Sequence, residues 1–201
     1  MTKPGVGLQR PVVCTGVRQN GRMYGPVITG SKFRLRPPSE EDAPIFCDWF
    51  ADLEVTMYLS RRAAPSLQLE REWLQKMATS ETDIVWCIEF EDRTIGITGA
   101  HRIDWQNCHA STGTAIGDKG VWGKGIGGEL MCLRRDHLFR EYRLNKLKSA
   151  YLEGNEASAR AQRAAGYREV GRFRQEFFRD GRWLDQIQTE LLREDWERPQ
   201  R

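Results

Sequence analysis

The sequence predicts one mixed α/β (α+β) domain with a mostly antiparallel sheet. Three observations support this fold class. Strand-like segments at 84–90, 94–102 and 110–116 follow one another with short turns between them, as in an antiparallel meander. A glycine-rich loop at 123–128 then opens an amphipathic helix, and the turn Asp180-Gly181 joins two final strands. The predicted order is β-α-α-β-β-β-α-β-α-β-β.

The first three elements have clear local signals. Phe33–Arg36 is predicted to be a strand that ends at Pro37 and Pro38. Ser39, with Asp42 three residues later, is typical of a helix N-terminus, so we expect a helix that continues to about residue 53. Between residues 65 and 80, apolar side chains recur at every fourth position and predict a second helix. They are Leu69, Trp73 and Met77.

The later elements follow from changes in periodicity. Apolar residues alternate over 84–90, as in a half-buried strand, and a turn leads into 94–102. Apolar side chains share one face over 126–137, which predicts a helix after the glycine loop. A strand at 147–151 and a helix at 157–164 follow, and the alanine stripe of that helix predicts close packing.

Composition excludes several classes of protein. At 39% hydrophobic and 29% charged residues, the 201-residue chain is expected to fold rather than stay disordered. A net charge of +3 is too small to indicate nucleic-acid binding. We expect no membrane span and no signal peptide, because no apolar run is long enough. Five scattered cysteines without a C-x-x-C pair predict unpaired thiols in a reducing cytoplasm, and the histidine spacing predicts no metal site.

We expect three segments along the chain: a flexible or draped extension at 1–31, a domain at 32–196 and a short tail at 197–201. The first 39 residues contain seven basic residues and no Asp or Glu. This composition is typical of a solvated tail, and the alternative is an arm that contacts phosphate or RNA.

The glycine loop is the strongest functional signal. It contains Gly123, Lys124, Gly125, Gly127 and Gly128. A glycine loop at a helix start leaves backbone N–H groups available, with the positive end of the helix dipole behind them. The loop is therefore predicted to bind a phosphate group of a cofactor.

Two common phosphate-binding loops do not fit. Gly123, Gly125 and Gly128 match G-x-G-x-x-G, but six residues separate the preceding strand from the loop and the chain has only one βαβ unit. A Walker A loop needs a glycine where Asp118 stands, and it needs Ser or Thr after Lys124. A dinucleotide-dependent oxidoreductase is therefore a minor alternative.

The loop instead resembles the pyrophosphate loop of the GNAT superfamily of acetyl-CoA-dependent N-acetyltransferases. Trp122-Gly123-Lys124-Gly125 is similar to a variant found in the branch of ribosomal-protein alanine acetyltransferases. The resemblance covers about residues 24–196. It includes the segments 33–36, 41–43, 153–158, 165–167 and 178–183, and 191–196 as a C-terminal strand.

This resemblance implies a GNAT fold whose sheet is splayed between the fourth and fifth strands, 110–116 and 147–151. It implies that acetyl-CoA binds there, with pantetheine along the fourth strand and the pyrophosphate on the glycine loop. Lys124 would add charge or point to solvent. The implied cofactor-binding residues are Thr114, Ala115, Ile116, Trp122, Gly123, Lys124, Gly125, Ile126, Gly127, Gly128, Asn155 and Ser158.

The expected catalytic groups are less complete. Asn155 and Ser158 form a helix-capping pattern, and the resemblance adds that Asn155 can contact pantetheine and Ser158 can protonate the leaving thiolate. Many relatives carry a tyrosine acid and a glutamate base where this chain has Gln162 and Ser111. His109 is then the best candidate base, acting through ordered water, because an imidazole titrates near neutral pH. Its alternative is a surface or hydrogen-bonded histidine.

A weak base favours an acceptor amine that is easily deprotonated. An α-amine has a pKa of about 8 against about 10.4 for lysine, a difference of about 3.3 kcal/mol in presenting the neutral form. We therefore expect a protein or peptide N-terminal α-amine as the acceptor. The alternatives are a small amine, such as a polyamine or antibiotic, and a non-catalytic acyl-CoA-binding module.

The acceptor is expected to enter between the region after the first helix and the last hairpin. The candidate residues are Trp49, Asp52, Glu54, Tyr58 and Phe178. Each has a plainer alternative, core packing for the aromatics and solvation for the carboxylates. Exposed edge strands near the C-terminus make a homodimer plausible.

Overall fold

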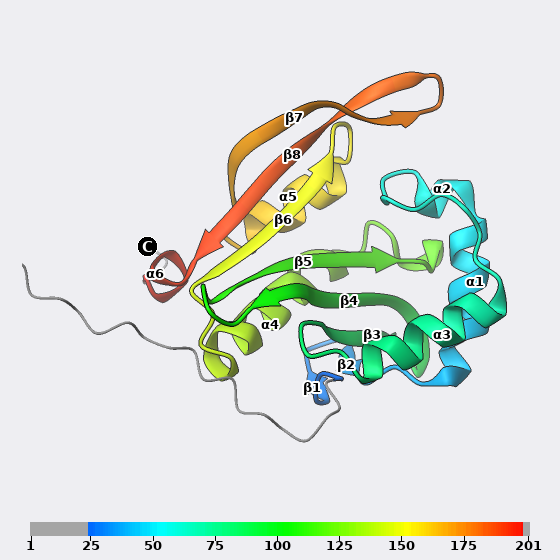
Figure 1. Ribbon diagram of the computed structural model, residues 1–201, viewed down its shortest axis with the longest axis horizontal. Helices are drawn as coiled ribbons and strands as arrows, with labels where there is room; N and C mark the ends of the chain where they lie inside the picture. Colours follow the sequence, from blue (N-terminus) through cyan, green and yellow to red (C-terminus); the bar gives the residue numbers. More distant parts are fainter. Residues whose placement is uncertain (1–23, 199–201) are drawn as a thin grey trace, which may run out of the picture.

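An eight-stranded mixed sheet crosses the molecule in the order β1-β2-β3-β4-β5-β6-β8-β7 (Figure 1). The computed structural model describes residues 24–198. Its strands are β1 (Ile28–Thr29), β2 (Arg34–Arg36), β3 (Ile84–Phe90), β4 (Arg93–Asp104), β5 (His109–Ile116), β6 (Lys146–Leu152), β7 (Arg168–Arg179) and β8 (Arg182–Leu192). Its helices are α1 (Ala43–Ala51), α2 (Leu53–Thr56), α3 (Leu67–Ala78), α4 (Ile126–Glu141), α5 (Glu156–Ala164) and α6 (Arg193–Glu197), with short 3-10 turns at Glu40–Asp42 and Lys119–Val121. The predicted fold class is confirmed.

Local sequence signals determine the first helices. Ser39 and Asp42 form the predicted capping box, and the 3-10 turn at Glu40–Asp42 leads directly into α1. Asp52 then adopts an extended conformation and accepts a hydrogen bond from the backbone N–H of Glu54. This residue splits the expected single helix into α1 and α2. Ser66 caps α3 through its hydroxyl, which accepts from Leu69 N–H.

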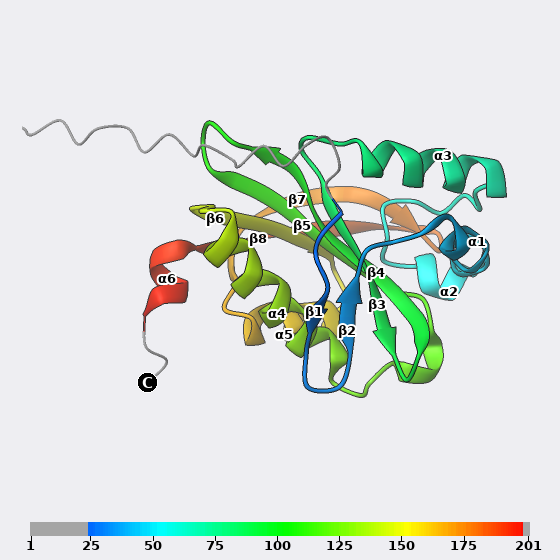
Figure 2. The same ribbon diagram turned by 90° about the horizontal axis from the view of Figure 1, so that it is seen from below.

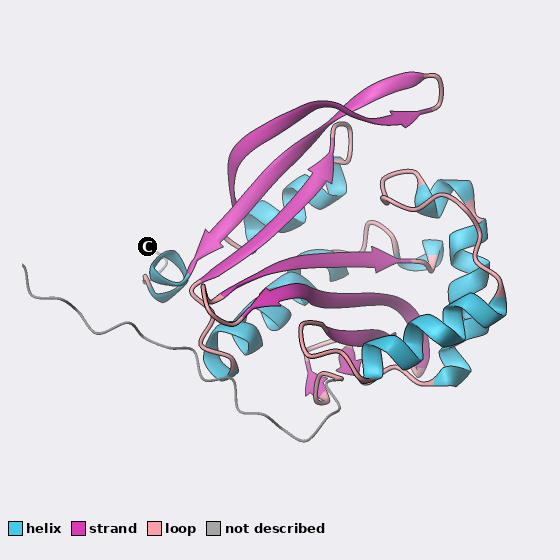
Figure 3. Ribbon diagram, viewed as in Figure 1, coloured by secondary structure: helices cyan, strands magenta, loops and turns pink. Residues whose placement is uncertain are grey.

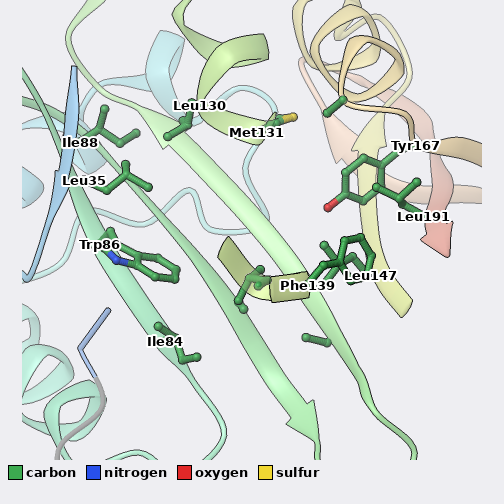
Figure 4. Close-up of a cluster of buried hydrophobic side chains, with 14 of the residues drawn as sticks. Leu35, Ile84, Trp86, Ile88, Leu130, Met131, Phe139, Leu147, Tyr167 and Leu191 are labelled. Atoms are coloured by element: carbon green, nitrogen blue, oxygen red, sulfur yellow. The ribbon is translucent and has the colours of Figure 1, made fainter. Parts of the chain in front are cut away.

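Helices cover both faces of the sheet (Figure 2). One face packs against α4, and its buried cluster includes Leu35, Trp86, Ile88 and Leu130 (Figure 4). The other face packs against α1 and α3 through Phe46, Trp49, Leu74 and Cys87. Because strand residues alternate between faces, Trp86 and Cys87 belong to different clusters. The sheet is thus fixed from both sides, which holds its centre in place for the site.

The sheet opens between β5 and β6, as the resemblance implied (Figure 3). These parallel strands pair only over His109–Ser111 and Lys146–Lys148. Just beyond this pairing, hydrogen bonds from side-chain hydroxyls replace the backbone hydrogen bonds between the two strands. Thr112 Oγ1 donates to the Lys148 carbonyl at 3.1 Å, and Ser149 Oγ donates to the Thr112 carbonyl at 3.1 Å. We call the divergence beyond Thr112 the split.

Close helix packing lines one side of the split. A Cβ at Gly127 would lie 3.7 Å from Ala161 Cβ and 4.0 Å from Ile116 Cδ1, and one at Gly128 would lie 3.9 Å from Ala164 Cβ. The predicted alanine stripe of α5 therefore packs on the first turn of α4. This contact brings the glycine loop, the end of β5 and α5 together.

Two expectations need correction. Residues 191–196 are not one strand, because β8 ends at Leu192 and α6 follows. Arg193 accounts for this turn, since its guanidinium donates to the carbonyls of Phe139 and Leu144. Cys108 is disulfide-bonded, so the expectation of unpaired thiols is wrong for this residue. Cys47, Cys87 and Cys132 are free, and Cys14 lies outside the described residues.

The described part of the predicted extension packs on the domain. Ile28–Thr29 forms β1, a strand that the sequence pattern did not predict. Trp86 Nε1 donates to the Pro26 carbonyl at 2.9 Å, and Ser31 bonds Glu129 of α4. Residues 1–23 and 199–201 lie outside the described residues.

Candidate active site

The glycine loop has the backbone of an anion-binding turn. Gly123 and Gly125 have φ angles of 77° and 79°, in the left-handed region where a Cβ is costly. A Cβ at either position would meet nothing within 4 Å, so the space above the loop is open. Gly125 is the N-cap of α4 and has no side chain to cap the helix. The N–H groups of Ile126, Gly127 and Gly128 therefore have no carbonyl partner one turn earlier in the helix.

Not every predicted loop residue offers its N–H group. Trp122 N–H donates to the Lys119 carbonyl at 3.2 Å, and Lys124 N–H approaches the Val121 carbonyl at 3.4 Å. The indole N–H of Trp122 donates to the Ile116 carbonyl at 3.0 Å and ties the loop to the end of β5. Lys124 is exposed, while Ile126 is buried in the core.

A buried arginine of α4 contacts β5, the strand that is predicted to bind the cofactor. Arg134 of α4 is 1% exposed, and its Nη1 donates to the Gly113 carbonyl at 2.7 Å and to Thr114 Oγ1 at 2.9 Å. Among residues 24–198 it has no carboxylate partner. Ala115 pairs with Ile97 of β4. Sequence reasoning missed Arg134 because an arginine in an amphipathic helix is expected to face solvent, although its position four residues after Leu130 places it on the predicted apolar face.

Asn155 and Ser158 lie at the first turn of α5, beside the split. Asn155 Oδ1 accepts from Ser158 N–H at 3.0 Å, so the predicted cap is present. Ser158 Oγ accepts from Gln162 Nε2 at 3.0 Å. Ser158 is half-buried and stands one turn before Ala161, which packs on Gly127. The glycine loop and Ser158 therefore border the same split.

The candidate base lies farther away. His109 is in the paired part of β5, three residues or about 10 Å before Thr112 at about 3.3 Å per residue. Its Nε2 lies 3.6 Å from Asp104 Oδ2 and 3.4 Å from Lys148 Nζ. Ser111 contacts Arg102 Nη2 at 3.4 Å. His101, the other strand histidine, bonds Asp83 Oδ1 at 3.0 Å, and burial lowers its pKa despite that carboxylate.

Tyr58 connects the two sides of the split. Its hydroxyl donates to the Gly154 carbonyl at 3.1 Å, immediately before α5. Arg179, at the tip of the β7–β8 hairpin, donates to the carbonyls of Met57 and Leu59. The segment after α2 is therefore fixed to both the start of α5 and the last hairpin.

The predicted acidic residues are already paired. Lys119 Nζ lies 2.7 Å from Asp52 Oδ2 and 2.9 Å from Glu54 Oε2. Hydrogen bonds that Lys119 donates to these carboxylates raise the pKa of Lys119, and the bond to Asp52 lowers the pKa of that carboxyl group. This cluster ties α2 to the turn that leads into the glycine loop.

The two predicted aromatics have different environments. Trp49 is mostly buried and lines, with Asp52 and Lys119, a cavity of about 750 Å³ on the α1 side of the sheet. Phe178 is 53% exposed and packs against Trp183 at a centroid distance of 5.2 Å, with the two rings tilted by 56°. Strand alternation directs Phe178 away from the face that carries Phe177 and Arg179. Phe177, which Arg179 covers at 5.0 Å, is on the side of Met57 and Leu59.

Comparison with protein families identifies the fold. A family model described as an acetyltransferase (GNAT) domain matches residues 32–168, more than half of the chain. The chain belongs to the GNAT acetyltransferase family. It is an acyltransferase.

Relatives of this GNAT domain are also N-acetyltransferases. It is 24% identical over 172 residues to an uncharacterized N-acetyltransferase p20 of Bacillus licheniformis, covering 82% of this chain and 95% of the relative. A spermidine N-acetyltransferase from Vibrio cholerae, solved with CoA and spermine, has a TM-score of 0.77 at 19% identity, covering 84% of this chain and all of that one. RimL, a ribosomal L7/L12 alpha-N-protein acetyltransferase solved with CoA, has a TM-score of 0.74 at 17% identity, covering 83% and 97%. At these identities the two structures show the shared fold alone.

Among the described residues, no helix is long and apolar enough to cross a membrane. Within the same part of the chain, no three His, Cys, Asp or Glu side chains gather in a way that could hold a metal ion.

Proposed function

We propose that this GNAT domain transfers the acetyl group of acetyl-CoA to a primary amine by direct attack, and that the acceptor is a protein or peptide N-terminal α-amine. The observation that carries the proposal is the common border of the glycine loop, the half of β5 that does not pair with β6, and the first turn of α5. A loop suited to phosphate and a serine hydroxyl that border one split fit a long anionic thioester.

The residues of the split fit CoA. The open space above Gly123 and Gly125 and the N–H groups of residues 126–128 suit a pyrophosphate. The part of β5 that leaves β6, residues 114–116, offers backbone groups to the pantetheine arm. Asn155 and Ser158 are the polar side chains at the start of α5 on the same split.

Acetyl-CoA and the protein contribute different parts of the reaction. Acetyl-CoA supplies an acyl carbon that is already activated as a thioester. The chain must hold the donor, admit the amine in its neutral form and stabilise negative charge on the leaving sulfur. Ser158 is the candidate for the last task. His109 is the candidate base, and its distance from Thr112 means that it acts through water.

The N-terminal acceptor is supported by the weakness of this base. A neutral α-amine costs about 3.3 kcal/mol less to present than a neutral lysine amine at the same pH. The pairing of Asp52 and Glu54 with Lys119 points the same way, because it leaves less free negative charge for a polycation. A small-amine substrate is the second candidate. It is favoured by the cavity on the α1 side, which Trp49 lines together with Asp48 and other acidic residues.

The test is thiol release from acetyl-CoA by the purified full chain with a panel of amines. The panel contains peptides with free N-termini, the same peptides with blocked N-termini and one lysine, and spermidine. Mass spectrometry locates the acetyl group. Acetylation of only the free N-termini supports the proposal, and acetylation of spermidine alone selects the second candidate. Absence of CoA binding in calorimetry would overturn both.

His109→Gln tests the base assignment within the same assay. If His109 acts through water, kcat/KM for a peptide α-amine falls in the variant while CoA affinity and thermal stability stay unchanged, and the acidic limb set by the substrate amine itself remains. An unchanged kcat/KM would show that the amine needs no help from this residue.

A further inference from the structure

The side-chain amide of Gln162 is held by three partners. Its Nε2 donates to the Ala150 carbonyl at 3.2 Å and to Ser158 Oγ at 3.0 Å, and its Oε1 accepts from Thr189 Oγ1 at 2.5 Å. Gln162 is 2% exposed, so water does not compete for these bonds. It occupies the position where many relatives carry a tyrosine acid.

This network fixes the orientation of the amide. A backbone carbonyl only accepts hydrogen bonds, so the group that faces Ala150 must be the NH₂ of Gln162 and not its oxygen. The same NH₂ group faces Ser158 Oγ. Both N–H donors are then used, one on each partner, and Thr189 satisfies the oxygen.

The orientation determines the role of the serine hydroxyl. Because Gln162 donates, Ser158 Oγ is the acceptor in this contact and its own proton is free to point elsewhere. The backbone of Ser158 is also fixed, since its N–H is bonded to Asn155. The hydroxyl thus has a fixed position and one occupied lone pair, at the edge of the split.

We infer that Gln162 is a positioning residue: it occupies one lone pair of Ser158 Oγ and so directs the serine proton toward the sulfur that leaves in the reaction. This inference rests on the proposed function, and it specifies how the site works without a tyrosine acid. Thr189 and Ala150 hold Gln162 in the orientation that makes it a donor.

The step balances without a strong acid. The amine nitrogen forms the new bond to the acyl carbon, the carbon–sulfur bond breaks, and its electron pair goes to sulfur. The extra proton on nitrogen leaves to water. A serine hydroxyl is a weaker acid than a thiol, so Ser158 keeps its proton and donates a hydrogen bond to the thiolate, which takes its proton from solvent.

The sharpest test is Gln162→Glu. A glutamate has nearly the same shape and can still accept from Thr189. Burial holds its carboxyl group protonated, and its single proton is needed by the Ala150 carbonyl. Ser158 would then donate to the glutamate instead of to sulfur. We expect kcat to fall about threefold to tenfold, the value of one neutral hydrogen bond. Gln106→Glu, at an exposed position, is the control and should leave kcat unchanged.

A double-mutant cycle separates positioning from structural support. If Gln162 acts through Ser158, then Gln162→Glu has no further effect on kcat in the Ser158→Ala background. Independent, multiplying losses would overturn the inference. Gln162→Met, which removes all three bonds, repeats the cycle if the glutamate variant fails to fold.

A second readout needs no turnover. The pKa of the thiol of bound CoA, followed by the ultraviolet absorbance of its thiolate, should rise in Ser158→Ala, in Gln162→Glu and in the double variant by the same amount. Equal thiol pKa values in wild type and Gln162→Glu would overturn the inference and leave the proposed function intact. A wild-type chain that binds no CoA would instead overturn the proposed function itself.

Discussion

The backbone conformation of Gly125 bears on the proposed binding of phosphate. Its φ of 79° lies where a Cβ costs about 1–2 kcal/mol, and the space that a side chain would enter is open. No packing contact requires the glycine at this position, which fits the proposed anion-binding loop. Gly181, in the β7–β8 turn, has a φ of 78° and equally open space, but it lies far from the loop in the sequence and belongs to a hairpin.

This pair of glycines gives a matched prediction. Gly125→Asp places a carboxylate at the N-cap of α4, so we expect CoA affinity to fall by more than tenfold while the fold is kept. Gly181→Asp carries the same charge and similar backbone strain, and it should leave CoA affinity unchanged. Calorimetric titration with CoA and thermal melts check both. Equal affinity in the two variants would remove the pyrophosphate assignment from the loop.

At the scale of elements, two contacts hold the site in shape. One is the packing of α4 on α5 through Gly128 and Ala164. The other is the buried pair of Arg36 on β2 with Asp42, which joins the start of the α1 region to the sheet. Each can be tested by changes that do not touch the reacting groups.

Gly128 is expected to tolerate one added carbon and no more. A Cβ there would be in ordinary contact with Ala164 at 3.9 Å, so Gly128→Ala should be neutral or stabilise α4 by up to about 1 kcal/mol through helix propensity. Gly128→Leu overfills the interface and should destabilise by about 1–3 kcal/mol. Urea unfolding measures both. Equal stability of the alanine and leucine variants would mean that the helices are free to separate.

Asp42 is expected to govern stability in acid. Burial alone would raise its pKa, but hydrogen bonds from Arg36 and from the Ser39 N–H lower it from 3.8 to about 2. Because the pKa is lower in the folded state, ionised Asp42 stabilises the fold above pH 3.8, and this stability is lost as the pH falls toward 2. The contribution to the free energy of unfolding is about 2 kcal/mol. Asp42→Asn should lose at least this amount at pH 7 and flatten the acid limb. Asp48→Asn, at an exposed site on α1, is the control, and an acid limb as steep in Asp42→Asn as in the wild type would contradict the assignment.

At the scale of the molecule, local signals predicted local features. The capping box at Ser39, the N-cap at Asn155, the glycine loop and the Asp180-Gly181 turn are all encoded within a few residues, and the structure contains each of them. Features that depend on distant partners were not predicted. The bonds of Gln162 to Ala150 and Thr189 join three separate elements, Arg193 ends β8 through carbonyls about 50 residues earlier, and Arg134 reaches β5 from α4.

The last strand pair gives the remaining prediction, which concerns assembly. β7 is an edge strand of the sheet, and Val170 and Phe173 on it are 54% and 53% exposed. An exposed edge with apolar side chains is a template for a second strand. We therefore expect the chain to form a homodimer through β7, seen by sedimentation velocity. Val170→Lys with Phe173→Lys should give a monomer that still binds CoA. Leu69→Lys, at an equally exposed leucine of α3, should leave the dimer intact. A wild-type monomer, or a dimer that survives the double lysine variant, would show that β7 is not the interface.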